Sequence, residues 1–273
     1  MTKTLYVSDL DGTLLRRDET LSRFTIDTIN DLVERGMIFS YATARSLVTA
    51  SKVTAGLSTN IPVIIYNGSF IKHGGTGETL LSNAFSGAES NGVLDVLLQR
   101  GVYPIVYAMI DGVEKFSYCA DRESRGTKIF NDTRRGDVRD HPVTEPTELY
   151  RGEVFHITCI DEEDILSPIY EQFKDTYQCI FHRDIYSGEQ WLEIQPCGAT
   201  KAQAILSLKH FLGCDRVVCF GDGKNDISMF EIADECYAVE NADPALKAIA
   251  TSVIGSNEQD GVAKWLAEHA QTK

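Results

Sequence analysis

The sequence has few of the features that mark secreted, membrane-spanning or metal-thiolate proteins. Its seven cysteines are odd in number and scattered, with no Cys-x-x-Cys pair, which argues against a disulfide framework and a zinc site. The N-terminus has no apolar region of the signal-peptide type, and the longest apolar run, residues 61–66, is far too short to span a bilayer. We therefore expect free thiols, a cytoplasmic location and no membrane partner.

The sequence also lacks the charge and the motifs of several functional classes. Its net charge of −14 argues against a nucleic-acid partner, because nucleic-acid binders use Lys and Arg to displace counterions. Its six histidines show no metal-ligand spacing, and there is no Gly-x-Ser-x-Gly turn, so histidine-based and serine-based catalysis have no support. The overall charge does not exclude a small anionic substrate, which responds to a local site.

The order of the predicted elements indicates an α/β protein. Apolar runs that read as buried strands lie at 5–7, 37–42 and 63–66. Helices are predicted between them, and this alternation is typical of a doubly wound parallel sheet with helices on both faces.

From about residue 84 the rhythm changes to hairpins with occasional helices. The clearest signal is Asp111-Gly112 between two strand-like runs, because this dipeptide suits the turn that matches strand twist. The first pattern resumes near Trp191. We predict an inserted α+β domain over residues 84–188 and a core domain made of residues 1–83 and 189–273.

Polar side chains gather where the predicted core strands end, which is where doubly wound sheets bind ligands. Four clusters fall at such ends: Asp9 with Asp11, Thr43 with Arg45, Lys201 beside the re-entry of the sheet, and Asp222 with Asn225 and Asp226. Asp9 and Asp11 would repel each other unless a cation relieves them, and a hard divalent metal is the simplest relief. Calcium loops starting at Asp9 or Asp222 fail, because other residues occupy required ligand and glycine positions.

Two of these clusters bear on the choice between a phosphate site and simpler roles. Thr43 alone would more often cap a helix, and Lys201 alone would more often be a surface charge. However, a lysine in the first helical turn opposes the helix dipole unless an anion lies in front of both, which points to phosphate. Gly221-Asp222-Gly223 superficially resembles a dinucleotide fingerprint, but Asp226 replaces the third glycine, so metal binding is the better interpretation.

Taken together, these motifs resemble the four motifs of the haloacid dehalogenase superfamily, in order and at suitable spacing. The matching segments are Asp9-Leu10-Asp11-Gly12-Thr13, Thr43, Lys201 and Gly221-Asp222-Gly223-Lys224-Asn225-Asp226. The insert resembles the type IIB cap of the Cof-like hydrolases, and further segments of that branch are matched by Tyr66-Asn67-Gly68, Asn241-Ala242 and 257–262. Ala44 and Ala202 depart from the glycines common in that branch, which bears on substrate fit more than on chemistry.

The resemblance implies a Rossmannoid core with an inserted cap, and a role for each motif residue. Asp9 would be the nucleophile, Asp11 the general acid and base, and Lys201 would offset the charge of nucleophile and phosphate. The residues implied to bind the phosphoryl group are Thr43, Asn225 and Gly12. Those implied to hold Mg²⁺ are Asp9, Asp11 through its main-chain carbonyl, Asp222 and Asp226. Candidate substrate-selecting residues are Arg45, Asn67, Arg183 and Tyr186.

The implied function is a Mg²⁺-dependent phosphatase that acts through an aspartyl-phosphate on small phosphorylated metabolites, such as sugar phosphates, pyridoxal phosphate or flavin mononucleotide. The alternatives are a phosphomutase or phosphotransferase and a non-catalytic sensor of phosphorylated metabolites. Asp11 favours hydrolysis or transfer to a hydroxyl, and a pure sensor would gain nothing from a nucleophile.

Overall fold

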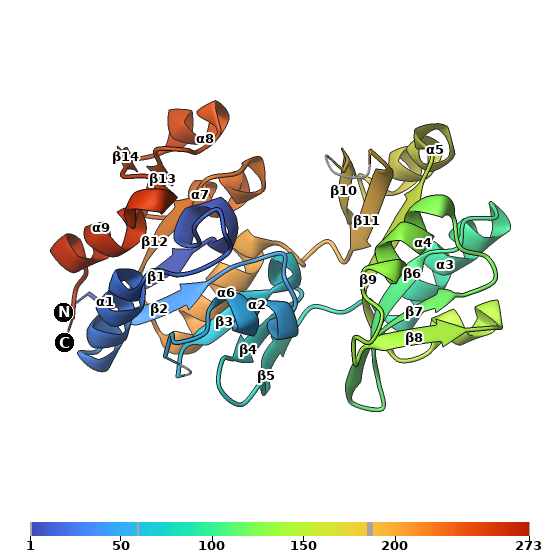
Figure 1. Cartoon of the computed structure of the whole chain (residues 1–273), viewed down its shortest axis with the longest axis horizontal. Helices are drawn as coiled ribbons and strands as arrows, with labels where there is room; N and C mark the ends of the chain where they lie inside the picture. Colours follow the sequence, from blue (N-terminus) through green and yellow to red (C-terminus); the bar gives the residue numbers. More distant parts are fainter. Residues whose placement is uncertain (1, 59, 185–187, 273) are drawn as a thin grey trace. The chain divides into compact units, whose positions relative to one another are not determined.

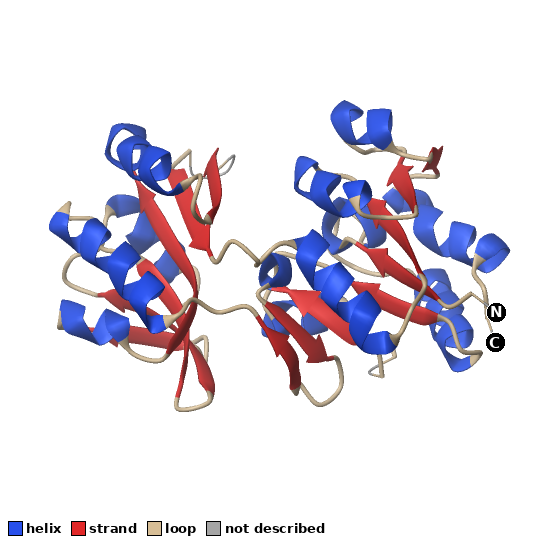
Figure 2. Ribbon diagram, turned by 180° about the vertical axis from the view of Figure 1, so that it is seen from behind, coloured by secondary structure: helices blue, strands red, loops and turns tan. Residues whose placement is uncertain are grey.

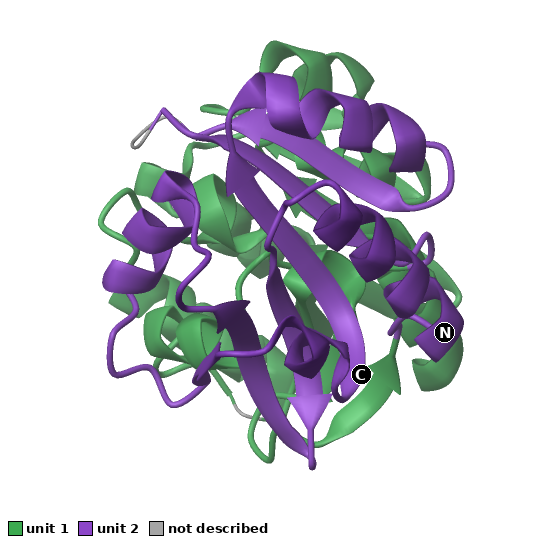
Figure 3. Ribbon diagram, turned by 90° about the vertical axis from the view of Figure 1, so that its right-hand side faces the viewer, with its two compact units in different colours: residues 1–82, 199–273 green, residues 83–198 purple. Residues whose placement is uncertain are grey.

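The computed structural model describes residues 2–58, 60–184 and 188–272. The chain forms two compact units, one made of residues 1–82 and 199–273 and the other of residues 83–198 (Figure 3). The first unit is built around a parallel sheet with helices, which confirms the predicted α/β fold class.

The sheet of the first unit has the order β14-β13-β12-β1-β2, and every pair of neighbours is parallel. A single parallel bridge between Ala42 and Ile64 links it to the antiparallel strands β3-β4-β5. The strands are β1 (Thr4–Ser8), β2 (Ile38–Tyr41), β3 (Pro62–Ile65), β4 (Phe70–His73), β5 (Thr79–Ser82), β12 (Arg216–Gly221), β13 (Glu235–Val239) and β14 (Ser252–Ile254).

Helices cover both faces of this sheet: α1 and α9, which contact each other, lie on one face and α6 on the other (Figures 1 and 2). Serine or threonine side chains cap α1, α2 and α6 at their N-termini, as expected from the residues that precede them. The helices of this unit are α1 (Arg23–Glu34), α2 (Leu47–Val53), α6 (Lys201–Leu212), α7 (Ile227–Glu231), α8 (Pro244–Ile249) and α9 (Gly261–His269). Single turns are η1 (Leu10–Leu14), η2 (Tyr66–Gly68), η4 (Lys224–Asp226) and η5 (Asn257–Gln259).

The second unit holds a six-stranded sheet of order β10-β11-β9-β6-β7-β8, antiparallel except for the pair β7-β8. Its strands are β6 (Ile105–Ile110), β7 (Val113–Cys119), β8 (Asp140–Val143), β9 (Glu153–Asp161), β10 (Gln178–Arg183) and β11 (Gln190–Gln195). Its helices are α3 (Gly87–Gln99), α4 (Arg125–Asp132) and α5 (Glu163–Phe173), with the turn η3 (Pro146–Tyr150). The predicted hairpin at Asp111-Gly112 joins β6 to β7.

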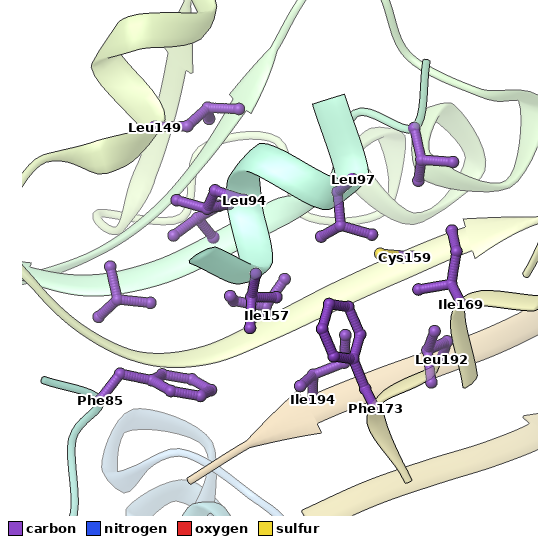
Figure 4. Close-up of a cluster of buried hydrophobic side chains, with 14 of the residues drawn as sticks. Phe85, Leu94, Leu97, Leu149, Ile157, Cys159, Ile169, Phe173, Leu192 and Ile194 are labelled. Carbon is purple, nitrogen blue, oxygen red and sulfur yellow. The ribbon is translucent and has the colours of Figure 1, made fainter. Parts of the chain in front are cut away.

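One face of this sheet carries the hydrophobic core of the second unit. Leu94 and Leu97 of α3 and Ile169 and Phe173 of α5 pack against strand residues that include Ile157 (Figure 4). The helix α4 packs on the opposite face, where Phe130 meets Trp191 edge-on with ring centroids 5.4 Å apart. The sheet is therefore buried on both faces over part of its area.

The predicted domain boundary near residue 188 is wrong. Gln190–Gln195 forms β11, which pairs with β10 and β9 inside the second unit, so that unit ends at 198. The physical reason is that Leu192 and Ile194 of β11 complete the core of the second unit, where both are fully buried.

Candidate active site

The two acids of the first motif leave the end of β1 in different directions. Asp9 continues the sheet, since its N–H donates to the carbonyl of Phe220 over 2.9 Å, and it is only 5% exposed. Leu10, the first residue of the turn η1, is fully buried. The side chain of Asp11 is 50% exposed, so only Asp9 belongs to the buried part of the site.

Three carboxylates converge at the carboxyl edge of the parallel sheet. Ligand oxygens of Asp9, Asp222 and Asp226 all lie within 4.8 Å of one another. Asp9 follows β1, and the other two follow the neighbouring strand β12. A group of carboxylate oxygens is the donor set that hard divalent cations prefer. The side chain of Asp11 is not part of this group, which agrees with a contribution through its main-chain carbonyl alone.

Among the residues that the structure describes, Lys201 is the one whose ammonium lies inside this cluster. It is the first residue of α6, it is 2% exposed, and its Nζ lies 2.6 Å from Oδ1 of Asp9 and 2.7 Å from Oδ1 of Asp226. Thr200 caps the helix through Gln203 N–H. The sequence interpretation of Lys201 as a surface charge is thereby excluded.

The charges of the cluster favour the binding of a further cation. Burial and the neighbouring Asp226 raise the pKa of Asp9 well above the usual carboxyl range, against the opposite effect of Lys201. Burial and the same neighbour raise the pKa of Asp222 to about 6. Burial disfavours the charged form of Lys201, but the carboxylates of Asp9 and Asp226 raise its pKa overall. Three carboxylates face one ammonium, so the residues present fit a divalent metal.

The remaining hydrogen bonds give different roles to Asp222 and Asp226, the two acids that follow β12. Oδ2 of Asp226 accepts the main-chain N–H groups of Asp222 and Gly223, each over 3.0 Å, and its Oδ1 is held by Lys201. Oδ1 of Asp222 accepts the hydroxyl of Thr13 over 3.0 Å, whereas its Oδ2 accepts no hydrogen bond from the described residues. Asp222 is therefore the more available metal ligand, and Asp226 chiefly shapes the loop.

Gly12 allows the close approach of β1 and β12 at this point. Its φ is +78°, and a Cβ atom there would lie 2.3 Å from Oδ2 of Asp222. Its carbonyl accepts the side chain of Asn241 over 2.7 Å. Sequence reasoning proposed Gly12 for phosphate binding and gave no role to the hydroxyl of Thr13. The signal available for both was their place in the first motif.

The Thr43 loop is fixed from two sides. Thr43 is fully buried, and its hydroxyl accepts the main-chain N–H of Arg45 over 3.1 Å. Its carbonyl accepts the N–H of Asn67 over 2.9 Å, and the carbonyl of Arg45 accepts the N–H of Tyr66 over 3.0 Å. This loop therefore places the Thr43 hydroxyl and the Arg45 side chain on a rigid support.

The turn that makes these contacts is strained. Tyr66, Asn67 and Gly68 all have positive φ, at 49°, 53° and 110°, and a bulky residue such as tyrosine rarely adopts this conformation. Gly68 packs against Thr200, since a Cβ atom on Gly68 would lie 2.3 Å from the carbonyl oxygen of Thr200. Oδ1 of Asn67 is buried without a hydrogen bond from the described residues. The turn thus joins the Thr43 loop to the start of α6.

The other candidate residues are placed less centrally. Asn225 lies exposed on the turn η4 after β12. Arg45 forms an ion pair with Asp11 instead of pointing freely into solvent. Arg183 belongs to the second unit, at the end of β10, and pairs with Glu163 over 2.8 Å. Tyr186 lies outside the described residues.

No helix in the described ranges is long and apolar enough to cross a membrane. All seven cysteines are unpaired, as expected from their scatter.

Comparisons with known proteins cover almost the whole chain. The sequence profile of the haloacid dehalogenase-like hydrolases matches residues 6–266. The 5-amino-6-(5-phospho-D-ribitylamino)uracil phosphatase YitU of Bacillus subtilis is 28% identical over 97% of both chains. The pyridoxal phosphate phosphatase YbhA of Escherichia coli is 24% identical over 98% of this chain and 99% of its own.

Solved structures agree on the fold. A crystal structure from Thermotoga maritima matches with a TM-score of 0.80 at 23% identity, covering 100% of this chain and 99% of its own. At this identity the likeness supports the fold alone. The profile match and the named phosphatases confirm the enzyme class predicted from the motifs, and the chain belongs to the haloacid dehalogenase-like hydrolase family.

Proposed function

We propose that this chain is a Mg²⁺-dependent phosphatase that hydrolyses small phosphorylated metabolites through an aspartyl-phosphate on Asp9. The observation that carries the proposal is the buried carboxylate of Asp9, held 2.6 Å from the ammonium of Lys201 beside two further acids. In this arrangement the first unit is the catalytic core and the second unit is the cap. The unpaired cysteines support a cytoplasmic location.

The proposed reaction starts with attack by Asp9. One carboxylate oxygen forms a bond to phosphorus while the bond from phosphorus to the ester oxygen breaks, and Asp11 protonates that leaving oxygen. Burial disfavours ionised Asp9 and raises its pKa, and the Lys201 ammonium opposes that effect only in part. The positive charge of a bound Mg²⁺ would favour the ionised nucleophile further. In the second step Asp11 takes a proton from water, which attacks phosphorus and releases phosphate and free Asp9.

The remaining site residues orient the phosphoryl group and the metal. The hydroxyl of Thr43, the amide of Asn225 and the main chain at Gly12 are proposed to bind phosphoryl oxygens, as the motifs imply. Asp9, Asp222 and the main-chain carbonyl of Asp11 would hold Mg²⁺, with Asp226 supporting the loop. When bound, Mg²⁺ supplies positive charge that offsets the charges of nucleophile and phosphate.

The substrate class follows from the named relatives and the candidate selecting residues. YitU is named for a phosphorylated ribitylaminouracil and YbhA for pyridoxal phosphate. The candidate substrates are therefore compounds of these two kinds, together with sugar phosphates and flavin mononucleotide. Arg45 and Asn67 of the first unit and Arg183 and Tyr186 of the second stay the proposed substrate-selecting residues.

The test is phosphate release from a panel of these compounds, measured with Mg²⁺ and with a chelator. We expect metal-dependent release that is lost in Asp9→Asn and is reduced roughly 100-fold to 10,000-fold in Asp11→Asn, because proton transfer contributes about that much. Asp27→Asn, on the exposed face of α1, is the control and should leave release unchanged. Release that persists in Asp9→Asn would contradict the nucleophile, and an isomerised product without free phosphate would indicate a phosphomutase.

A further inference from the structure

Arg45 lies between two carboxylates at the edge of the site. Its Nε is 2.9 Å from Oδ2 of Asp11 and its Nη2 is 2.5 Å from Oδ1, so the guanidinium engages both oxygens of that acid. The same Nη2 lies 3.3 Å from Oε1 of Glu19. The Arg45 side chain is 20% exposed, against 50% and 64% for the two acids, so the arginine is the inner member of the group.

The loop that carries Glu19 has an uncommon backbone conformation. Glu19 has φ of +60°, an uncommon conformation for a residue other than glycine, asparagine or aspartate. Two main-chain hydrogen bonds, from Glu19 N–H to the Arg16 carbonyl and from Arg16 N–H to the Thr20 carbonyl, close the turn that holds it. Strain of this kind persists only where the surrounding structure over-determines it.

This loop is also anchored at a distance in sequence. The guanidinium of Arg16 pairs with the carboxylate of Asp260 over 3.1 Å, and the N–H of Arg17 donates to Glu258 over 2.7 Å. The side chain of Asn257 donates to the carbonyl of Leu15 over 2.9 Å. Glu19 is therefore carried by a support that does not depend on Arg45.

The pairing has a consequence for the acid and base of the reaction. The Arg45 fork occupies one lone pair on each oxygen of Asp11, so the carboxyl keeps a lone pair for exchanging a proton with a leaving group or a water, while the fork sets the direction in which that lone pair points. An arginine with Asp11 as its sole partner would move with that carboxylate. A second, anchored carboxylate keeps the guanidinium in place and so defines where Asp11 stands.

We propose that Glu19 is a positioning residue, which fixes Arg45 and through it orients Asp11 for proton transfer. The proposal rests on the proposed function, because it concerns the role of Asp11 in that reaction. Glu19 itself touches neither substrate nor phosphoryl group in this role.

The test is a double-mutant cycle in the full chain, with Glu19→Gln made in the wild type and in Arg45→Met. We expect Glu19→Gln to lower kcat about fivefold with KM nearly unchanged, since an exposed ion pair contributes on this scale. In Arg45→Met the same substitution should have no further effect on kcat. The matched control is Asp18→Asn on the same turn, which bonds only locally to Thr20 and should leave kcat unchanged.

Two outcomes would overturn the proposal. An equal loss of kcat in the Arg45→Met background would mean that Glu19 acts independently of Arg45, as a structural residue of the loop. A rise in KM at constant kcat would make Glu19 a substrate contact. Either result in an active wild-type enzyme leaves the proposed function standing.

A second measurement does not need turnover. The free energy of unfolding by urea is compared across the same cycle, and we expect the effects of Glu19→Gln and Arg45→Met to be non-additive because the two side chains interact directly. Additive effects would remove the contact on which the proposal rests. If the wild type releases no phosphate, the proposed function fails and the role of Glu19 fails with it, whatever coupling is found.

Discussion

Gly12 contributes to the site in two ways, through its backbone conformation and through the space that its missing side chain leaves. Its φ of +78° disfavours any side chain, and its missing Cβ leaves the space taken by the Asp222 carboxylate. Gly112, in the hairpin between β6 and β7, also has φ of +78° but has nothing within 4 Å of its would-be Cβ. The two glycines therefore form a matched pair.

We expect Gly112→Ala to destabilise the protein by about 1–2 kcal/mol, since it forces alanine into the left-handed region. Gly12→Ala should cost at least as much, because its methyl group must also displace the Asp222 carboxylate. Only Gly12→Ala should abolish Mg²⁺-dependent phosphate release, because its methyl group displaces Asp222, the proposed metal ligand. Urea unfolding and phosphate release measured on both variants check this. Equal activity in the two variants would mean that Asp222 can move without loss of function.

Arg45 and Asp11 illustrate what residue-level sequence reasoning can and cannot provide. The meeting of Asp9 with Asp222 and Asp226 could be predicted, because these acids follow two apolar strands of one parallel sheet. Lys201 begins α6 instead, and its place beside Asp9 was implied by the motif resemblance alone. The fork of Arg45 on Asp11 could not, since it depends on how two loops lie side by side. The same holds for Glu19, whose position follows from contacts to residues more than two hundred positions away.

At the scale of elements, β9 is buried on both faces. Ile157 and Cys159 join the core beneath α3 and α5, while His156 and Thr158 point to the other face and bond to each other over 2.9 Å. His156 is 7% exposed, and burial lowers its pKa from 6.5 to about 4. The strand thus carries a histidine that is neutral when folded.

This histidine should make the second unit sensitive to acid. The folded unit binds fewer protons at His156 than the unfolded chain, so stability falls as the pH drops from about 6.5 towards 4. Between about pH 7.5 and pH 5 we expect the wild type to lose about 2 kcal/mol more than His156→Gln. Urea unfolding followed by the fluorescence of Trp191, in a Trp265→Phe background, measures this for the second unit.

The control for this pH dependence is His210→Gln, which replaces an exposed histidine on α6. It should leave the pH dependence of the second unit as in the wild type. An unchanged slope in His156→Gln would mean that His156 is charged or hydrated in the folded state.

Most elements followed from local signals, whereas their assignment to sheets did not. The helix α3 begins at a Ser86 capping box and ends at Gln99, and the capping box is a signal that lies in the local sequence. Residues 192–194 fell in the predicted core domain but belong to β11 of the second unit. The sequence could not place them, because an apolar run of that length carries no information on its partners. Pairing with β9 and β10 is a long-range contact that only the folded chain reveals.

On the scale of the whole molecule, the chain combines two units with separate cores and one tryptophan each. Trp265 packs with Tyr237 and Phe220 in the first unit, and Trp191 with Phe130 in the second. The two crossings between units lie at 82/83 and 198/199. A deletion of the second unit should therefore leave a folded first unit only if the chain is cut at these two positions.

We expect a variant with residues 83–198 replaced by a short Gly-Ser linker to unfold cooperatively, as followed by Trp265 fluorescence. Replacing 84–188 instead should cause aggregation, because Leu192 and Ile194, both fully buried in the intact chain, lose the sheet that covers them. Light scattering on heating compares the two. Equal solubility would mean that β11 does not depend on its neighbours.

The soluble deletion variant also tests the cap. If the second unit selects substrates, its loss should leave Mg²⁺-dependent cleavage of simple aryl phosphates, since every proposed reacting group lies in the first unit, while the preference among metabolites flattens. The ratio of kcat/KM between the best and the worst metabolite is the quantity to compare. An unchanged ratio would place selection in the core, where Arg45 and Asn67 would have to account for it.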